Sequence, residues 1–541
     1  MQLAKWIAYA KFLLGLPRFL ARTTSAEEAQ LITKQRLNNR ETNFLNILQK
    51  AVFNYPLSPY LKLFHLFGYS YADVKRLINQ YGLEKTLEIL RDAGIYFSIE
   101  EFKGIIPVRR KGIEFKVVPQ DFNNLLLETK KHNRSIPCND NAFRIVSSIG
   151  IDGLREIGTP QIILFSQAYK DFYPRPFPIL WMPTFLSVPA IGGALMLIRA
   201  AMPPIKWFYY NIPARILAEG FSGKVGFKLL VFMIRLFLHN SAYPEYISRE
   251  ELGKVIKYII NTEKQLFFFA SSREVIKLCH LTEREKCSLK NVVFYWTGEP
   301  LTLRRRSHIQ AQGAHILSSY AFREIGHVGF SCPYGSSEVD EYHLSSDIVA
   351  LIERKRAVSS TLNKNVFLWT GLSAHLPKIM INVESGDYGS IYKKECKCIY
   401  GKLGMDTHVS RIRSFEKLIS PEIDFFGERL QDLIEDVLPA RIGGEDCDYQ
   451  FVQESENNMP PRLYLYVSPS LGKIDVARIS DSIFNYLKHQ DDAEKIISSL
   501  YIHDNMIGIK RLKPIPTLRE KVWPVFVKTR GLSRALKKES Q

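Results

Sequence analysis

Two groups of residues in this 541-residue chain have types and spacings suited to chemistry. In residues 294–329, one apolar run ends in Gly298-Glu299-Pro300, and a second is followed by the aromatic ring of Tyr320 and the carboxylate of Glu324. The second group is the thiol pair Cys396-Lys397-Cys398, which could hold zinc if the fold supplies two further ligands. Reduced, metal-free cysteines are the alternative for this pair.

The pattern of residues 294–329 predicts a parallel β-α-β unit. An apolar strand runs into a tight loop, a helical pattern rich in arginine covers residues 301–312, and Gly313 ends that helix. A second apolar strand covers residues 315–320. Ligands of parallel sheets bind at the carboxyl ends of the strands, so we expect the side chains that follow both strands to line a binding site.

This stretch resembles the adenylate-forming enzymes, and within them the phenylacetate–coenzyme A ligase branch. The resemblance implies that residues 298–300 form the TGEPLT-like loop that lies along an acyl-adenylate. It also implies a Y-G-x-[ST]-E signature, in which Tyr320 covers the adenine and Glu324 holds Mg²⁺. Ala321 and Arg323 depart from the Gly and the Ser or Thr of that signature.

A second segment in the family's order resembles the Ser/Thr/Gly-rich loop that holds the ATP phosphates through its backbone amides. We expect this loop between two apolar strands, the second of which follows Pro160. The candidate phosphate ligands are Ser147, Ser148, Gly150 and Thr159. Ile149, Ile151 and the insertion-like residues 154–157 depart from the pattern, which leaves open that the phosphates are held differently or that adenylation is slow or lost.

Three later segments also resemble family elements. Residues 366–370 and 376–383 are predicted to be paired strands that end in a Gly-Asp turn, and the resemblance makes Asp387 the acceptor of both ribose hydroxyls. Arg413 matches the hinge Arg that contacts ribose and phosphate, with Glu416 at the pivot. Lys521 matches the Lys placed on the α-phosphate, where its charge would assist transfer. Near Lys521, Pro516 and Thr517 also match, whereas Glu520 replaces a Gly.

The resemblance supplies the two missing ligands of the thiol pair. Members of this ligase branch carry a small zinc knuckle of Cys, His and Cys-x-Cys in corresponding segments. The equivalent residues here are Cys332, His343, Cys396 and Cys398. A structural zinc is therefore expected at these four side chains, with metal-free cysteines and a surface histidine as the alternative.

Composition narrows the class of protein. The net charge of +18 could serve nucleic acid, an anionic membrane, or anionic ligands such as ATP and coenzyme A. Nucleic acid is disfavoured, because the basic residues are spread along the chain and no zinc-finger, RNA-recognition or helix-turn-helix signature is present. Seven unevenly spaced cysteines favour a reducing compartment.

Three apolar segments raise the question of a membrane. Residues 1–24 lack a cleavage signal and predict either an interfacial helix or one docked on the protein's own surface. Residues 176–198 carry no charge, but prolines and glycines interrupt them, which favours a buried or membrane-contacting segment over a span. Residues 227–238 predict a further apolar helix, for which core packing is the default.

We expect an α/β protein with the adenylate-forming fold, a large α/β N-terminal domain and a small α+β C-terminal domain. Its predicted parts are a helical lead-in at 1–130, an adenylate-binding core at 131–412 and a mobile C-terminal domain at 413–541. Helices are expected at residues 41–53, 71–81 and 83–93 of the lead-in. In the core, a strand at residues 265–269 is expected to border an acyl pocket.

The resemblance implies an acid–thiol ligase that forms an acyl- or aryl-adenylate with ATP and Mg²⁺. It would then transfer the acyl group, aryl or fatty, to coenzyme A or to a carrier or acceptor protein. We expect a cytoplasmic protein, and a peripheral position at the inner face of the membrane is left open. The alternative is a catalytically weakened relative that acts as a binding or scaffold subunit, because the phosphate segment, Ala321, Arg323 and Glu520 depart from the family.

Overall fold

A computed structural model describes most of the chain. The described residues are 14–127, 150–173, 177–182, 188–210, 244–247, 251–270, 272–299, 301–335, 340–357, 363–414, 433–454, 462–488, 507–515, 522 and 524–528. The chain divides into two compact units. The larger comprises Met1–Arg354, Phe367–Ser385 and Gly389–Ile412, and the smaller comprises Lys355–Val366, Gly386–Tyr388 and Arg413–Gln541.

The larger unit begins with a layer of helices. They are α2 (Ala26–Asn38), α3 (Arg40–Ile47), η1 (Leu48–Phe53), α4 (Pro59–Leu66), α5 (Tyr71–Tyr81), α6 (Leu83–Ala93) and α7 (Ile99–Phe102). The three helices predicted in this region are thereby confirmed. Local signals explain their bounds: the hydroxyl of Ser70 accepts from the amide of Asp73, whose carboxylate accepts from the amide of Ser70, and this capping box starts α5.

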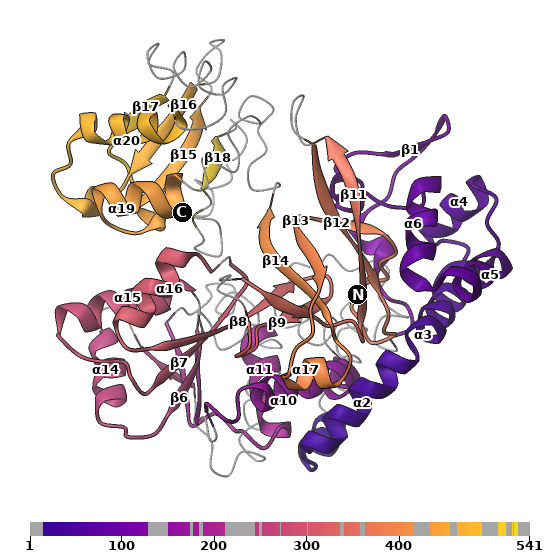
Figure 1. Ribbon diagram of the computed structural model, residues 1–541, viewed down its shortest axis with the longest axis horizontal. Coiled ribbons are helices and arrows are strands. Elements are labelled where there is room, and N and C mark those ends of the chain that lie inside the picture. The colour runs from indigo at the N-terminus through magenta and orange to yellow at the C-terminus, as the bar shows by residue number, and fades with distance from the viewer. Residues whose placement is uncertain are drawn as a thin grey trace, which may run out of the picture. The chain divides into compact units, whose positions relative to one another are not determined.

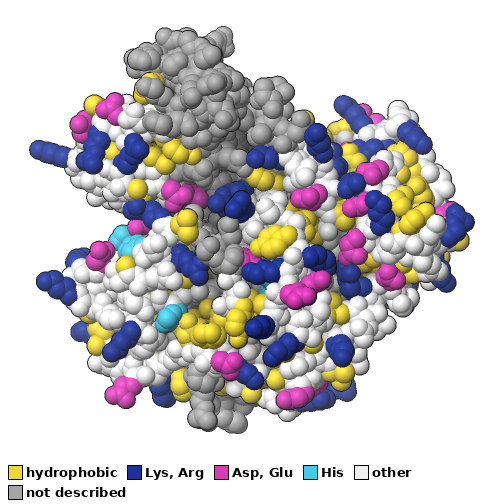
Figure 2. Space-filling model, in the orientation of Figure 1, with side chains coloured by type: hydrophobic (Ala, Val, Ile, Leu, Met, Phe, Trp, Pro, Cys, Tyr) yellow, Lys and Arg dark blue, Asp and Glu magenta, His cyan; other side chains and the backbone are white. Residues whose placement is uncertain are grey.

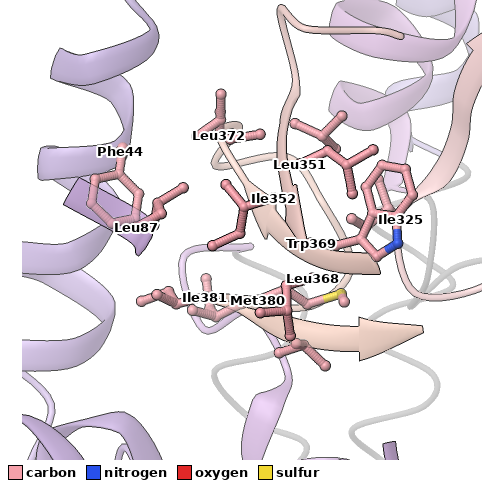
Figure 3. Close-up of a cluster of buried hydrophobic side chains, with 14 of the residues drawn as sticks. Phe44, Leu87, Ile325, Leu351, Ile352, Leu368, Trp369, Leu372, Met380 and Ile381 are labelled. Carbon is pink, nitrogen blue, oxygen red and sulfur yellow. The ribbon is translucent and has the colours of Figure 1, made fainter. Parts of the chain in front are cut away.

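These helices pack against strands that lie about 300 residues later in the chain. Phe44 of α3 and Leu87 of α6 lie on the side of the sheet toward which Ile352 points, and all three are buried (Figure 3). The buried amide of Asn382 fixes the end of α6, because it donates to the carbonyls of Leu87 at 2.8 Å and Ile95 at 3.2 Å. The helical layer and the sheet thus share one hydrophobic core.

A mixed sheet of twelve strands organises the larger unit. In spatial order the strands are β11 (Val349–Ala357), β12 (Asn363–Gly371), β13 (Val383–Lys393), β14 (Thr407–Ser414), β10 (Tyr342–Leu344), β9 (Gly326–Phe330), β8 (His315–Phe322), β7 (Val292–Thr297), β6 (Leu266–Ala270), β3 (Phe177–Met182), β4 (Lys206–Tyr209) and β5 (Pro244–Tyr246). The six strands from β8 to β5 are mutually parallel. Strand β9 turns back antiparallel to β8, and β10 pairs antiparallel with both β9 and β14.

Helices cover both faces of the parallel strands (Figure 1). Alternate residues of β6 show why: Phe267 and Phe269 pack toward α10 (Thr159–Ala168) and α11 (Val188–Arg199), whereas Leu266 and Phe268 pack toward the other face. That face is covered by α14 (Leu252–Ile260), α15 (Ser272–Arg284) and α16 (Leu303–Ala311). Burial on both faces explains why β6 and β7 are continuous apolar runs in the sequence. The predicted α/β class is confirmed.

Where the structure describes the apolar segments, their side chains lie largely in the core. Residues 176–198 contain strand β3 and helix α11, both largely buried, and no helix in the described part of the chain is long and apolar enough to cross a membrane. Residues 14–20 are helical and bury Leu16 and Phe19, which favours docking on the protein's own surface. Residues 227–238 lie outside the described residues.

Short elements complete the larger unit and make up the smaller one. In the larger unit they are β1 (Val108–Arg110), β2 (Ile113–Phe115), η2 (Pro119–Phe122), α9 (Gly150–Gly153), η4 (Leu154–Gly158) and α17 (Ile399–Lys402). The smaller unit has a four-stranded sheet in the order β17 (Ile507–Lys510), β16 (Arg462–Val467), β15 (Tyr449–Glu454) and β18 (Val525–Lys528). Its helices are η6 (Leu433–Val437), α19 (Leu438–Ile442), η7 (Asp446–Asp448), η8 (Pro469–Leu471) and α20 (Val476–Lys488), which gives an α+β unit with its own core.

Candidate functional site

The fold brings four side chains predicted as metal ligands together. Cys332 follows β9, His343 lies in β10, and Cys396 and Cys398 precede α17. Their ligand atoms all lie within 4.8 Å of one another. Cys332, His343 and Cys398 are buried and Cys396 is half-buried, so this pocket of thiols and imidazole is largely shielded from water.

The spacing within the cluster fits a tetrahedral ion. The sulfurs of Cys332 and Cys396 are 3.6 Å apart, and Sγ of Cys398 is 3.2 Å from Nε2 of His343. Zinc–sulfur bonds of about 2.3 Å and zinc–nitrogen bonds of about 2.0 Å place tetrahedral ligands roughly 3.5 Å apart. Nδ1 of His343 lies 2.9 Å from the carbonyl oxygen of Met405. A carbonyl only accepts, so Nδ1 carries the proton and Nε2 keeps a lone pair for a metal.

The charge around the cluster also suits a cation. A hydrogen bond from the Cys332 thiol lowers the pKa of the Cys398 thiol to about 3, against the effect of burial. The same interaction, together with burial, raises the pKa of Cys332. The buried carboxylate of Glu341 lies nearby and pairs with Lys394 at 2.6 Å. It also lies 2.8 Å from His408, and the ring centres of His408 and His343 are 4.0 Å apart. The residues present therefore fit a structural zinc ion.

A cavity of about 200 Å³ adjoins the cluster. Cys332, Glu341, Arg306 of α16 and Tyr169 are among the residues that line it. The hydroxyl of Tyr169 lies 2.9 Å from Oγ of Ser331. The walls are mainly polar, and a metal ligand belongs to them, so loss of the cluster would also alter this cavity.

The second part of the candidate site lies where β6 and β7 end. Gly298 adopts φ 81°, a left-handed conformation that suits glycine and turns the chain directly after β7. The carboxylate of Glu299 accepts from the hydroxyl of Ser272 and lies 3.7 Å from the guanidinium of Arg305, which stacks over the ring of Trp296 at 5.3 Å. The first two residues of the loop predicted to lie along an acyl-adenylate thus form a turn that is fixed by hydrogen bonds.

A network of hydroxyl groups and one imidazole lies between β7, β8 and β9, and the sequence did not single it out. Oγ of Ser319 lies 2.7 Å from the hydroxyl of Tyr295, 3.1 Å from that of Thr297 and 3.0 Å from Nδ1 of His327. Burial lowers the pKa of His327 to about 4, so its imidazole is neutral at pH 7. Ser, Thr and Tyr are too common for spacing alone to have revealed this network.

The two residues of the tyrosine signature lie in different elements, Tyr320 in a strand and Glu324 in a turn. Tyr320 lies inside β8, and its half-buried ring is 5.8 Å from the ring of Trp369 and 6.0 Å from that of Phe322. Glu324 is half-buried in the turn that joins β8 to β9. The strand therefore extends two residues past Tyr320, and the carboxylate comes from the hairpin turn.

The predicted phosphate loop is wrong in its local structure. Residues 150–168 form one helical run through α9, η4 and α10, and the strand expected after Pro160 is part of α10. Thr159 is fully buried, and its hydroxyl has no hydrogen-bond partner within the described ranges. Gly150 begins the helical run and is half-buried. The apolar stretch after Pro160 has no alternation that favours a strand, and packing between α2 and the sheet favours the helix.

The ribose and hinge candidates lie on neighbouring strands. Asp387 lies within β13 rather than in a turn, because residues 376–382 are irregular and the strand begins at Val383. Arg413 lies in the adjacent strand β14, and the hydroxyl of Ser414 beside it donates to the carbonyl of Gly386 at 3.3 Å. Both candidates are half-buried.

The remaining candidates lie outside the described residues. They are Ser147, Ser148, Pro300, Glu416, Pro516, Thr517, Glu520 and Lys521. Their proposed roles stay predictions.

Comparison with known proteins gives structural likeness only. No family profile and no curated protein sequence matches the chain. Among solved structures it is similar to 2-hydroxyisobutyryl-CoA ligase in the postadenylation state with R3-HIB-AMP, at 13% identity, a TM-score of 0.48, and coverage of 95% of this chain and 92% of that one. It is also similar to ATP-bound MatB from Rhodopseudomonas palustris, at 11% identity, a TM-score of 0.37, and coverage of 69% of this chain and 63% of that one. A third similar structure is O-succinylbenzoate coenzyme A synthetase from Bacillus subtilis with ATP and magnesium, at 11% identity, a TM-score of 0.39, and coverage of 68% of this chain and 65% of that one.

Proposed function

We propose that this chain is an AMP-forming acid–thiol ligase of the phenylacetate–coenzyme A ligase type. It would activate a carboxylic acid as an acyl- or aryl-adenylate with ATP and then pass the acyl group to a thiol. Coenzyme A and a carrier or acceptor protein are the two thiol sources to test.

One observation carries the proposal. The resemblance named four residues, spread over 67 positions of the sequence, as a zinc knuckle, and their ligand atoms lie within 4.8 Å of one another. Short motifs taken singly have a real false-positive rate, but a spatial cluster that follows from the family assignment is hard to obtain by chance. The knuckle therefore supports the branch as well as the metal.

The proposed roles of the other residues follow the strand ends. Glu299 and its loop would lie along the acyl-adenylate, Tyr320 would lie near the adenine, and Glu324 would hold Mg²⁺, a cation that prefers carboxylate oxygens. Asp387 and Arg413, on adjacent strands, would bind the ribose hydroxyls and the phosphate. Lys521 would offset charge that develops at the α-phosphate.

We propose an apolar acid, aryl or fatty, as the substrate. Phe165, Phe267 and Phe269 line an apolar cavity of about 20 Å³, which is too small for an acyl chain, so the pocket for the acid stays a prediction. The described cysteines are all free thiols, which supports the cytoplasm as the compartment.

A zinc ion at the cluster would cross-link β9, β10 and the segment before α17. With four protein ligands such an ion would have no open position for substrate, so its role would be structural. Cys332, Cys396 and Cys398 would bind as thiolates, and His343 would bind through Nε2.

ATP–pyrophosphate exchange tests the function directly. Purified protein with Mg²⁺ should catalyse exchange with at least one member of a panel of aryl and fatty acids, and hydroxylamine should trap the adenylate. Absence of exchange with every acid, together with no thermal shift on adding ATP, would refute catalysis. The helical segment at residues 150–168 would then favour a binding or scaffold subunit.

A further inference from the structure

Residues 103–118, which we call the basic hairpin, form an exposed projection of the larger unit. Strands β1 and β2 pair antiparallel, and Lys111 and Gly112 form the connecting turn with φ values of 46° and 77°. Positive φ at both positions defines the tight type I′ turn of two-residue hairpins. Arg110 anchors the hairpin through an ion pair with the buried carboxylate of Glu101 at 2.8 Å. The projection is therefore held in a fixed place by the core.

Large apolar side chains on this hairpin face solvent. Ile105 is 68% exposed, Ile106 45%, Ile113 51% and Val118 49%. The backbones of Gly104 and Val118 lie close together, because a Cβ added at Gly104 would be 3.5 Å from the Cα of Val118. Ile105 and Ile106 directly follow Gly104 in the chain, so they start next to Val118. Single exposed apolar residues are ordinary, but four within sixteen residues of one projection indicate an interaction surface.

Cations surround these apolar side chains. The exposed lysines of the hairpin and of neighbouring α4 are Lys62, Lys103, Lys111 and Lys116. The Lys111 ammonium lies 4.6 Å from the ring centre of Phe67, and that of Lys62 lies 5.1 Å from the ring centre of Phe115. Glu114, the one acidic residue in the sequence of the hairpin, is paired with Arg109 at 2.8 Å. In Figure 2, basic and hydrophobic side chains lie side by side over the region of β1 and α6, with acidic side chains among them.

We propose that the basic hairpin docks the protein onto an anionic lipid bilayer. Lysines near such a surface are each attracted by about 1 kcal/mol, and the exposed isoleucines can enter the boundary between head groups and acyl chains. The net charge of +18 favours the same anionic surface over the whole molecule. An acidic protein could satisfy the lysines, but a bilayer offers negative head groups directly above an apolar layer and so also accepts the exposed isoleucines.

Vesicle co-sedimentation of the full chain tests this surface. Wild type should bind vesicles that contain phosphatidylglycerol and should bind pure phosphatidylcholine vesicles far less, with the binding weakened at 0.5 M salt. The charge variant Lys111→Glu/Lys116→Glu should lower the partition coefficient at least tenfold, since two attractive charges become repulsive. The apolar variant Ile105→Ser/Ile106→Ser should lower it about tenfold through lost apolar burial.

Matched controls lie elsewhere in the larger unit. Lys290→Glu changes an exposed lysine before β7, and Ile260→Ser removes an isoleucine of α14 that is 53% exposed. Both should bind vesicles like wild type, and all variants should keep the melting temperature of wild type. Absence of vesicle binding, or equal binding by wild type and both hairpin variants, would overturn the proposal. Binding that falls in the charge variant but not in the isoleucine variant would also overturn docking and leave only long-range attraction.

Discussion

The metal cluster and the helical run at residues 150–168 show two opposite outcomes of the same resemblance. For the cluster, the sequence named four side chains and the fold brings their ligand atoms within 4.8 Å. For the phosphate segment, the sequence also offered candidates, but Thr159 is buried in α10 and no loop forms over residues 150–160. Both regions lie in the larger unit and border the same sheet.

The difference lies in what each site requires of the chain. A zinc site needs particular side chains, and Cys and His are rare enough to be recognised at a distance. A phosphate loop needs backbone amides in a particular conformation, and Gly, Ser and Thr are common in many conformations. Ile149, Ile151 and residues 154–157 already departed from the loop pattern, and the apolar side chains of this segment bury better as a helix.

Removal of one cysteine should have the largest effect. Cys396→Ser should reduce the metal content from about one ion per chain to near zero and destabilise the larger unit by roughly 3–5 kcal/mol, because the remaining thiolates lose their buried counter-charge. Elemental analysis and thermal melting measure the two effects. Cys287→Ser, which changes a cysteine outside the cluster, is the control. Metal-free wild type with the same melting temperature as Cys396→Ser would show that the cluster is only a group of reduced thiols.

The same distinction explains how much of the fold could be predicted. Helices α5 and α6 and the β7–α16–β8 unit follow from apolar periodicity and from caps, which are local signals. Strand β9 was not predicted, because the glycines of its short run hide a strand pattern. The helix at 159–168 depends on burial between α2 and the sheet, which no local pattern contains.

The network around His327 is a third case, because it consists of side chains, like the metal cluster, but was not predicted from the sequence. The pKa of His327 is lowered to about 4 in the folded protein, whereas an unfolded histidine titrates near 6.5. The unfolded chain therefore binds the extra proton first, and stability is lost as the pH falls from about 6.5 toward 4. The loss should approach 2–3 kcal/mol.

Chemical denaturation between pH 7.5 and 4.5 measures this effect. His327→Gln keeps a polar side chain without a titrating group, so its free energy of unfolding should depend less on pH than that of wild type. His65→Gln, at an exposed site in α4, should keep the wild-type slope. Equal slopes for wild type and His327→Gln would mean that the imidazole is solvated and that the network is not closed.

Asp387 stands between the two cases, because its role at the ribose stays a prediction whereas its predicted turn is a strand. Asp387→Asn should weaken ATP binding by about 2–3 kcal/mol, since a charged acceptor of the ribose hydroxyls becomes neutral. Calorimetric titration with ATP and Mg²⁺ checks this value. Asp406→Asn, which loses only an exposed ion pair with Lys393, should bind ATP like wild type. Unchanged affinity in Asp387→Asn would remove the ribose assignment and leave the fold intact.

The smallest expected effect is that of Thr159→Val, and it tests whether residues 150–160 bind phosphate. The Thr159 hydroxyl is buried and has no hydrogen-bond partner among the described residues, so it carries a desolvation cost. Thr159→Val keeps the shape and removes the hydroxyl, and it should stabilise the protein by about 1 kcal/mol without changing ATP affinity. The matched control is Thr282→Val, because that buried hydroxyl donates to the carbonyl of Cys279 at 2.9 Å and its removal should destabilise by about 1 kcal/mol. A loss of ATP affinity in a well-folded Thr159→Val would mean that the helix opens to bind phosphate, and the contrast with the metal cluster would then disappear.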